Sequence, residues 1–322
     1  MKTNLSKAPS YRAGPIRLAD FTEILALRGP RFKASQVDVI SALDRLEDED
    51  EDKFEGPIKD AFTELGRRAD GRYAIDGLYP FEIEKDSILL PKGILKDETK
   101  LLYIFLLLTT TLNMKSERKF ASLDGADLFE LLSKEVAVNF FGGRNDKRVK
   151  ARVFGTSRKI WDTGDDTLDQ TDISEFGKAI NELCKFLGEG DEYRPKTSKV
   201  SARDDKLDIV VCRDFSDGMH AKLSAFGQCK TGTHWGNELP RLQPHNFCNR
   251  WFSSNPTVMP VKFYFLADRV SSDQLRHHGY EAGILFERCR ILDYAHDLPP
   301  ALLKKCATWT RAAMKEHKLG TE

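Results

Sequence analysis

The sequence predicts an α/β fold, in which a mixed sheet flanked by helices follows a mainly helical N-terminal region. Residues 207–215 and 222–230 are rich in β-branched and apolar side chains. The polar, glycine-containing segment 216–220 separates them, which predicts a β-hairpin. Apolar runs at 258–267 and 283–292 predict two more strands that alternate with helical sequence, as is typical of an α/β core. Before residue 119, apolar residues recur mostly at helical spacing.

The N-terminal region is predicted to be helical, with one small hairpin. Residues 1–20 contain Pro9, Gly14 and Pro15 and are expected to form a tail or a strap over the surface. Helices are predicted over 21–28, 34–46, 57–68 and 97–114, and a hairpin over 81–83 and 87–90. We therefore assign residues 1–119 to a first unit.

The second unit, residues 120–322, is predicted to hold the sheet. A helix is expected over 123–141, because Ser122 or Asp124 can cap its start and Gly142-Gly143 can close it. Further helices are expected over 173–187, 246–252 and 300–318. Residues 144–203 are interpreted as an inserted, helical segment of this unit.

Composition limits the classes of partner and chemistry. Lys+Arg and Asp+Glu both number 50, so any nucleic-acid surface must come from a local cluster of cations. Six cysteines without CxxC spacing predict free, buried thiols in a reducing compartment, and we expect a cytoplasmic protein. The longest apolar run, 101–108, is too short to cross a bilayer, so no membrane partner is expected. There is no P-loop, HExxH or GxSxG motif.

Three polar side chains mark the predicted hairpin at 207–230. Asp208 precedes the apolar run of the first strand, and the second strand ends in Gln228-Cys229-Lys230. Because side chains alternate across a strand, Gln228 and Lys230 share one face and Cys229 points to the other. A carboxylate, a second oxygen ligand and a lysine at one corner of a sheet can bind a divalent metal and activate a water beside a phosphate.

This pattern resembles a known family. An Asp at the start of one strand, twenty residues before a (D/E/Q)xK on the next, resembles the PD-(D/E)xK nuclease superfamily. The Gln variant is similar to the Mrr-type catalytic domains of modification-dependent restriction enzymes. The resemblance implies a restriction-endonuclease-like fold, Mg²⁺ (or Mn²⁺) as cofactor, and endonucleolytic cleavage of nucleic acid, DNA more than RNA. It also implies a setting in bacterial restriction or anti-phage defence.

The resemblance implies a role for each residue of the motif. Asp208 would bind the metal together with Gln228 and the main-chain carbonyl of Cys229, while Lys230 would position or deprotonate the nucleophilic water. The first core helix of the family often carries an acidic residue over the metal, and Glu130 in Leu128-Phe129-Glu130 matches it. Glu182 is the rival for that role, and a plain surface glutamate on an amphipathic helix is the alternative for Glu130.

A basic cluster lies between the predicted first core helix and the hairpin. Interleaved cations and aromatic residues suit contacts with a phosphate backbone, although a solvated loop explains the same charges. The cluster's candidate nucleic-acid-binding residues are Arg144, Lys147, Arg148, Lys150, Arg152 and Arg158.

Two other interpretations remain open at this point. The Gln at position 228 is compatible with a non-catalytic nucleic-acid-binding or subunit-docking module on the same fold. The motif is also short enough to occur by coincidence in an unrelated α/β enzyme. Because the sequence has no P-loop, an ATP-driven step would need a companion ATPase or sensor subunit, and a homo-oligomer is equally compatible with the sequence.

Overall fold

The computed structural model describes residues 5, 8–44, 52–70, 77–154, 175–194 and 205–320. Of the predicted site residues, only Arg158 lies outside the described residues. Most of the predicted basic linker at 193–203 lies outside them as well.

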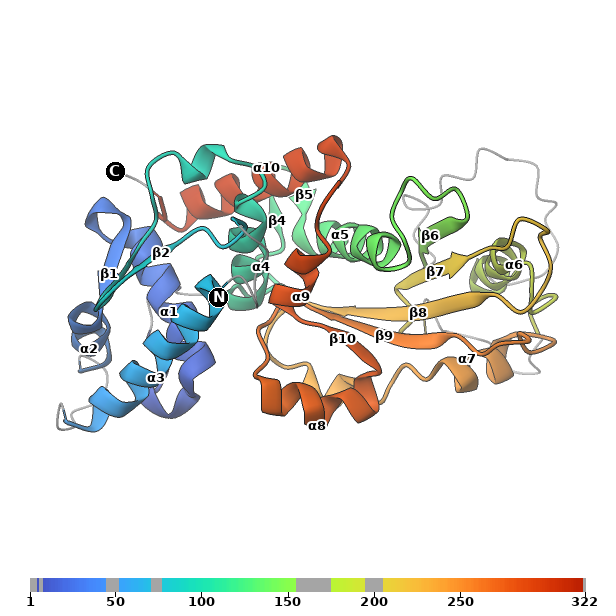
Figure 1. Ribbon diagram of the computed structural model, residues 1–322, viewed down its shortest axis with the longest axis horizontal. Helices are drawn as coiled ribbons and strands as arrows, with labels where there is room; N and C mark the ends of the chain where they lie inside the picture. The colour runs from blue at the N-terminus through green and yellow to red at the C-terminus, as the bar shows by residue number, and fades with distance from the viewer. Residues whose placement is uncertain are drawn as a thin grey trace.

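A five-stranded mixed sheet lies in the right half of the view in Figure 1, with the strand order β10-β9-β8-β7-β6. The predicted hairpin is confirmed: β7 and β8 are antiparallel, with Ile209 opposite Gly227. β9 runs parallel to β8 and places Tyr264 beside Gln228, and β10 is parallel to β9. The strands are β6 (Val149–Val153), β7 (Ile209–Arg213), β8 (Leu223–Lys230), β9 (Val261–Leu266) and β10 (Ile284–Phe286).

Helices cover both faces of this sheet, as the sequence predicts (Figure 1). α5 (Gly125–Phe140), capped by the Asp124 side chain, packs on the face formed by Ile209 and Val211. α6 (Glu175–Leu187) and α7 (Pro244–Trp251) pack on the opposite face, against Val210 and Phe226. α8 (Ser272–Ala282) covers the β9–β10 part of that second face. Strand alternation explains why neighbouring residues of β7 serve different cores.

The N-terminal region is mainly helical and includes the predicted hairpin. A three-stranded sheet has the order β1-β3-β2, and β2 and β3 form the hairpin. The elements are α1 (Pro15–Arg28), β1 (Lys33–Ser35), α2 (Gln36–Asp44), α3 (Asp52–Ala69), β2 (Glu82–Glu84), β3 (Ser87–Leu89) and α4 (Leu101–Thr111). α4 is buried almost throughout, which fits its apolar sequence.

The C-terminal helix α10 (Pro300–Glu316) returns to the N-terminal region (Figure 1). The Trp309 ring contacts the Phe105 ring of α4, with 5.2 Å between centroids. A short hairpin, β4 (Lys119–Phe120) and β5 (Leu123–Asp124), connects α4 to α5. One apolar core includes side chains of α1, α4, α5, the sheet and α10. The predicted boundary between residues 119 and 120 therefore lies inside a shared core.

Three sequence expectations need correction. Residues 15–20 form the start of α1, with Leu18 and Asp20 buried, because proline is tolerated in the first turn of a helix. The predicted helical insertion at 144–203 contains β6, an edge strand whose charges conceal its β pattern. The predicted strand at 283–292 ends at Phe286 and is followed by α9 (Arg288–Asp293).

The cysteines behave as predicted: all six are free and five are buried. Within the described ranges, no helix combines the length and the apolarity that crossing a bilayer requires.

Candidate functional site

Asp208 is fixed at the start of β7 by hydrogen bonds to both neighbouring strands. Its main-chain carbonyl accepts from the Phe154 N–H at 2.7 Å, and its own N–H donates to the Gly227 carbonyl at 2.9 Å. Its side-chain Oδ2 accepts from the main-chain N–H of Cys229 at 2.7 Å. The carboxylate therefore lies against the main chain of the predicted Gln228-Cys229-Lys230 motif.

Charges from three elements converge on Cys229. Burial and then the negative charges of Asp208 and Glu130 raise the pKa of the Cys229 thiol well above its usual value, while Lys230 acts in the opposite direction. Asp208, Glu130 and Lys230 therefore lie within electrostatic range of the same sulfur atom. The structure thus brings the predicted helix carboxylate, strand carboxylate and lysine to one rim of the sheet.

The rival glutamate, Glu182, lies elsewhere. It belongs to α6, and its carboxylate pairs with Lys185 one turn away at 2.9 Å. α6 packs over Val210 and Phe226, on the face of the sheet opposite to α5. The geometry therefore favours Glu130 for the role of helix carboxylate.

Gln228 is fully buried and its amide is unsatisfied. Its exposed fraction is 0 %, and neither Oε1 nor Nε2 has a hydrogen-bond partner among the described residues. The hydroxyl of Tyr264, its register partner on β9, is buried and equally without a hydrogen-bond partner there. Burial, followed by the charges of Glu238 and Asp208, raises the pKa of Tyr264, so this hydroxyl stays protonated. Buried polar atoms without partners are rare and indicate a place for a water or an ion.

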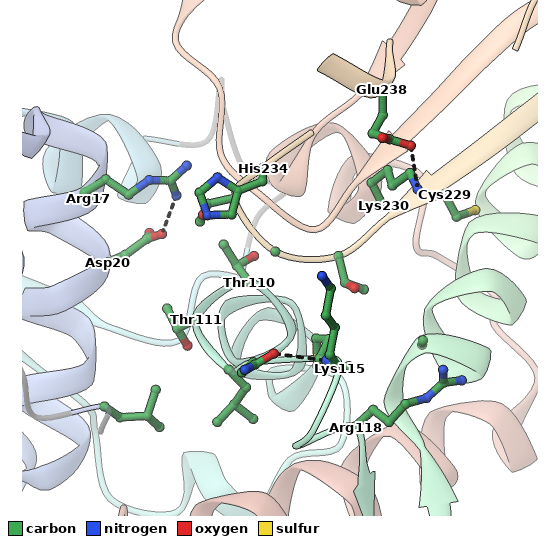
Figure 2. Close-up of a pocket in the computed structure, with 18 of the residues that line it drawn as sticks. Arg17, Asp20, Thr110, Thr111, Lys115, Arg118, Cys229, Lys230, His234 and Glu238 are labelled. Atoms are coloured by element: carbon green, nitrogen blue, oxygen red, sulfur yellow. Dashed lines mark hydrogen bonds and ion pairs between the residues drawn. The ribbon is translucent and has the colours of Figure 1, made fainter. Parts of the chain in front are cut away.

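Lys230 lines a cavity, and its amino group faces a carboxylate that sequence reasoning missed (Figure 2). Its Nζ lies 3.3 Å from Oε2 of Glu238, which belongs to the short 3₁₀ helix η4 (Gly236–Glu238). The other carboxylate oxygen of Glu238 lies 2.9 Å from the Arg241 guanidinium. No local sequence signal links Glu238 to the motif, since an irregular loop separates it from β8.

The cavity beside Lys230 has a volume of about 1020 Å³ and is rich in cations. α1, the end of α4, the segment 112–118 and the end of β8 contribute to its walls. Figure 2 shows Lys230, Glu238 and His234 on one side of it and Lys115 and Arg118 on the other. Clustered positive charge in a concave surface attracts polyanions. Its lining cations are Arg17, Lys115, Arg118, Lys206, Lys230 and Arg241. Arg17 pairs with Asp268, Arg118 pairs with Asp124 and Asp127, and Lys230 and Arg241 pair with Glu238.

Buried ion pairs hold α1 to the sheet at the back of this cavity. Arg17 donates to both oxygens of Asp268, at 2.6 and 2.5 Å, and the Trp235 indole N–H donates to Oδ2 of Asp268 at 2.8 Å. Asp20 accepts from Arg68 at 2.6 Å and from Arg288 at 2.8 Å. The N-terminal region is therefore a wall of the candidate site, which the sequence analysis did not predict because these residues are far apart in the chain.

None of the described residues of the predicted basic cluster lines this cavity. Val149 pairs with Arg213, which puts the start of β6 at the far end of β7 from Asp208, roughly 17 Å along the strand. Much of the cluster's charge is also paired. Arg144 binds Glu135 and Arg148 binds Asp146, both at 2.8 Å, Lys150 pairs with Asp214, and Arg152 stacks over the Phe186 ring, while Lys147 is exposed.

The donor set at the sheet rim suits a hard divalent cation. In the described part of the chain, no group of three or more His, Cys, Asp or Glu side chains could hold a metal ion. Asp208, the orphaned amide of Gln228 and the adjacent main-chain carbonyl of Cys229 are instead a mixed set of oxygen donors. Mg²⁺ and Mn²⁺ prefer carboxylate, carbonyl and water oxygens, so the residues present fit such an ion.

No family model matches the chain, and neither the curated proteins nor the solved structures contain a match to it.

Proposed function

We propose that the chain is a metal-dependent endonuclease that hydrolyses phosphodiester bonds, in DNA more than in RNA, on a restriction-endonuclease-like fold. The observation that carries this proposal is the Asp208 carboxylate bound to the main-chain N–H of Cys229, next to Lys230, at the edge of a cavity lined with cations. The mixed sheet, with α5 over the β7–β8 hairpin, agrees with the fold that the sequence resemblance implies.

Each residue has a role that follows from its place. Asp208, Gln228 and the carbonyl of Cys229 would hold Mg²⁺ or Mn²⁺, and Glu130, on the α5 side of the sheet, would act on the ion electrostatically from the other face. When bound, such an ion supplies Lewis-acid stabilisation of charge on the phosphate. The N–H of Cys229 fixes the orientation of the Asp208 carboxylate. Lys230 positions the attacking water and offsets negative charge that develops on the phosphate.

The cations of the cavity would bind phosphates that flank the scissile bond. Lys115, Arg118 and Lys206 line its walls, and each phosphate contact releases counterions and adds affinity. We extend the proposal to a cytoplasmic setting in bacterial restriction or anti-phage defence, where a companion ATPase or sensor subunit would control cleavage.

The test is cleavage of supercoiled plasmid by the full chain with Mg²⁺ or Mn²⁺. Asp208→Asn and Lys230→Met should each lower the rate by on the order of 100-fold or more, because the first removes the negative charge that holds the metal and the second removes the positive charge that faces the reacting phosphate. Lys147→Met is the matched control, since it removes an exposed lysine far from the cavity. Cleavage by both site variants at the wild-type rate would rule out the assignment.

A second candidate is a non-catalytic nucleic-acid-binding module. Two observations favour it: position 228 lacks a carboxylate, and Glu238 already neutralises Lys230. Such a module would bind DNA through the cavity and release no heat on titration with Mg²⁺ or Mn²⁺. Tight DNA binding without metal binding or cleavage would therefore select this alternative.

A further inference from the structure

We propose that Glu238 supplies the carboxylate that position 228 lacks, and that the Tyr264 hydroxyl orients the Gln228 amide, so that the divalent cation is held on the Tyr264 face of β8. This inference rests on the proposed function, because it concerns the same cation. It adds two residues, from η4 and β9, that no motif in the sequence indicates.

The faces of β8 decide which side chains can meet. A Cβ placed on Gly227 would lie 3.0 Å from the Phe265 ring and 3.4 Å from the Ile209 side chain, so Gly227 faces the α5 side. Gln228 and Lys230 must therefore face the opposite side, where Tyr264 lies beside Gln228 in register. Glu238 contacts Lys230 at 3.3 Å, which places its carboxylate on this same side.

This side of β8 holds polar atoms that lack hydrogen-bond partners among the described residues. Oε1 and Nε2 of Gln228 and the hydroxyl of Tyr264 are all buried and unsatisfied. A buried polar group without a hydrogen-bond partner is destabilising, so three such atoms side by side are explained by a bound water or ion. The Tyr264 hydroxyl can donate to Oε1 of Gln228, accept from its Nε2, or bond to a water around a bound ion.

Two carboxylates border these atoms. The charges of Glu238 and Asp208 both act on the Tyr264 hydroxyl. The Asp208 carboxylate also accepts a hydrogen bond from the main-chain N–H of Cys229, which lies between Gln228 and Lys230. Asp208, Gln228 and Glu238 thus offer three side-chain oxygen donors around one buried, polar point, which is the chemistry that Mg²⁺ and Mn²⁺ select.

The charge of the cation site explains why Glu238 would be a ligand. A glutamine in place of an acidic residue removes one negative charge from a cation site, and a nearby carboxylate restores it. Glu238 now pairs with Lys230 and Arg241, both of which line the cavity. If Glu238 serves only to neutralise these two cations, its removal should tighten binding of nucleic acid and leave the affinity for the metal unchanged.

The experiment measures Mn²⁺ binding to the full chain by calorimetry and electron paramagnetic resonance, without substrate. Wild type is compared with Glu238→Gln and Tyr264→Phe, with Asp208→Asn as the reference for a lost ligand. Glu182→Gln is the matched control, because Glu182 also sits in an ion pair with a nearby lysine. Circular dichroism confirms that each variant is folded.

We expect Glu238→Gln to weaken Mn²⁺ binding at least tenfold, and Tyr264→Phe to weaken it by about 10- to 100-fold as an orienting partner. Wild-type affinity in Glu238→Gln, alongside its loss in Asp208→Asn, overturns the inference and leaves the nuclease proposal standing. Unchanged affinity in Tyr264→Phe together with a raised melting temperature overturns the role of Tyr264. A wild-type chain that binds no Mn²⁺ overturns both proposals.

Discussion

The buried carboxylate of Asp20 should be indispensable for stability, and Asp20→Asn is the variant that shows it. Asp20 accepts three hydrogen bonds from guanidinium groups, one from Arg68 at 2.6 Å and two from Arg288 at 2.8 and 3.2 Å. Both arginines are at most 1 % exposed. The neighbouring arginines hold the pKa of Asp20 below its usual value despite its burial.

The magnitude follows from the environment. Asparagine keeps the shape of aspartate but removes its charge. Its NH₂ group, a donor, would also face the guanidinium donors of Arg68 and Arg288. Breaking a buried ion pair by removing one partner costs about 3–5 kcal/mol, because the remaining charge stays buried. Since whole domains are stable by only about 5–15 kcal/mol, the loss should be a large fraction of the total.

Urea denaturation followed by circular dichroism measures this free energy of unfolding. Glu182→Gln, in a solvent-accessible pair with Lys185, is the control and should change stability by less than about 1 kcal/mol. The double variant Asp20→Asn/Arg288→Met should lose less than the sum of the single variants, because it removes both charges. A loss below about 1 kcal/mol in Asp20→Asn would refute the account of the buried network.

Three further predictions concern pH, salt and thiols. The pKa values of Asp20, Glu135 and Asp214 are lowered by their cationic partners, so these carboxylates stabilise the folded state above pH ~4 and lose this effect as the pH drops below it. The urea concentration at the unfolding midpoint, measured between pH 7 and 2, should therefore decrease below pH ~4. The double variant Lys115→Ala/Lys206→Ala should reduce the slope of the logarithm of the DNA association constant against the logarithm of the salt concentration by about 2, at ~0.9 per phosphate contact. Lys147→Ala should leave this slope unchanged. A change in Lys147→Ala alone would indicate that DNA binds to the basic cluster at the far end of the sheet. Burial raises the pKa of Cys184 and Cys248 to about 12 and of Cys212 to about 11, so these thiols should react with a disulfide reagent at pH 7 only after unfolding.

The sequence predicted the hairpin, α5 and the face assignments of the motif, because each depends on a local period. The alternation in 222–230 decides which side Gln228 takes, and Asp124 and Gly142 bound a single helix. β6 escaped prediction because charged residues, the exposed Lys150 and the half-buried Arg152, interrupt its apolar pattern, as charges often do on edge strands. The partners of Lys150 and Arg152 are set by tertiary contacts, which the spacing of residues in the sequence does not encode.

The cavity could not be predicted for the same reason. Arg17, Lys115 and Arg241 come from segments separated by about a hundred residues each, and none belongs to a motif. Arg17 and Asp20 lie on α1, where polar residues led us to predict a tail. Their partners Asp268 and Arg288 are near the other end of the chain, so the sequence around α1 gives no sign that these charges are paired. Buried charges conceal a helix from hydropathy when the compensating charges are remote.

The packing of Trp309 against Phe105 has a practical consequence for anyone who dissects this chain. A fragment that starts at residue 120 would keep the packing of α10 on α5 but would lose the α4 side chains that cover the rest of its apolar face, and such a patch promotes aggregation. Fragments 1–119 and 120–322 should therefore be insoluble when produced singly and should recover a folded, 1:1 complex when refolded together.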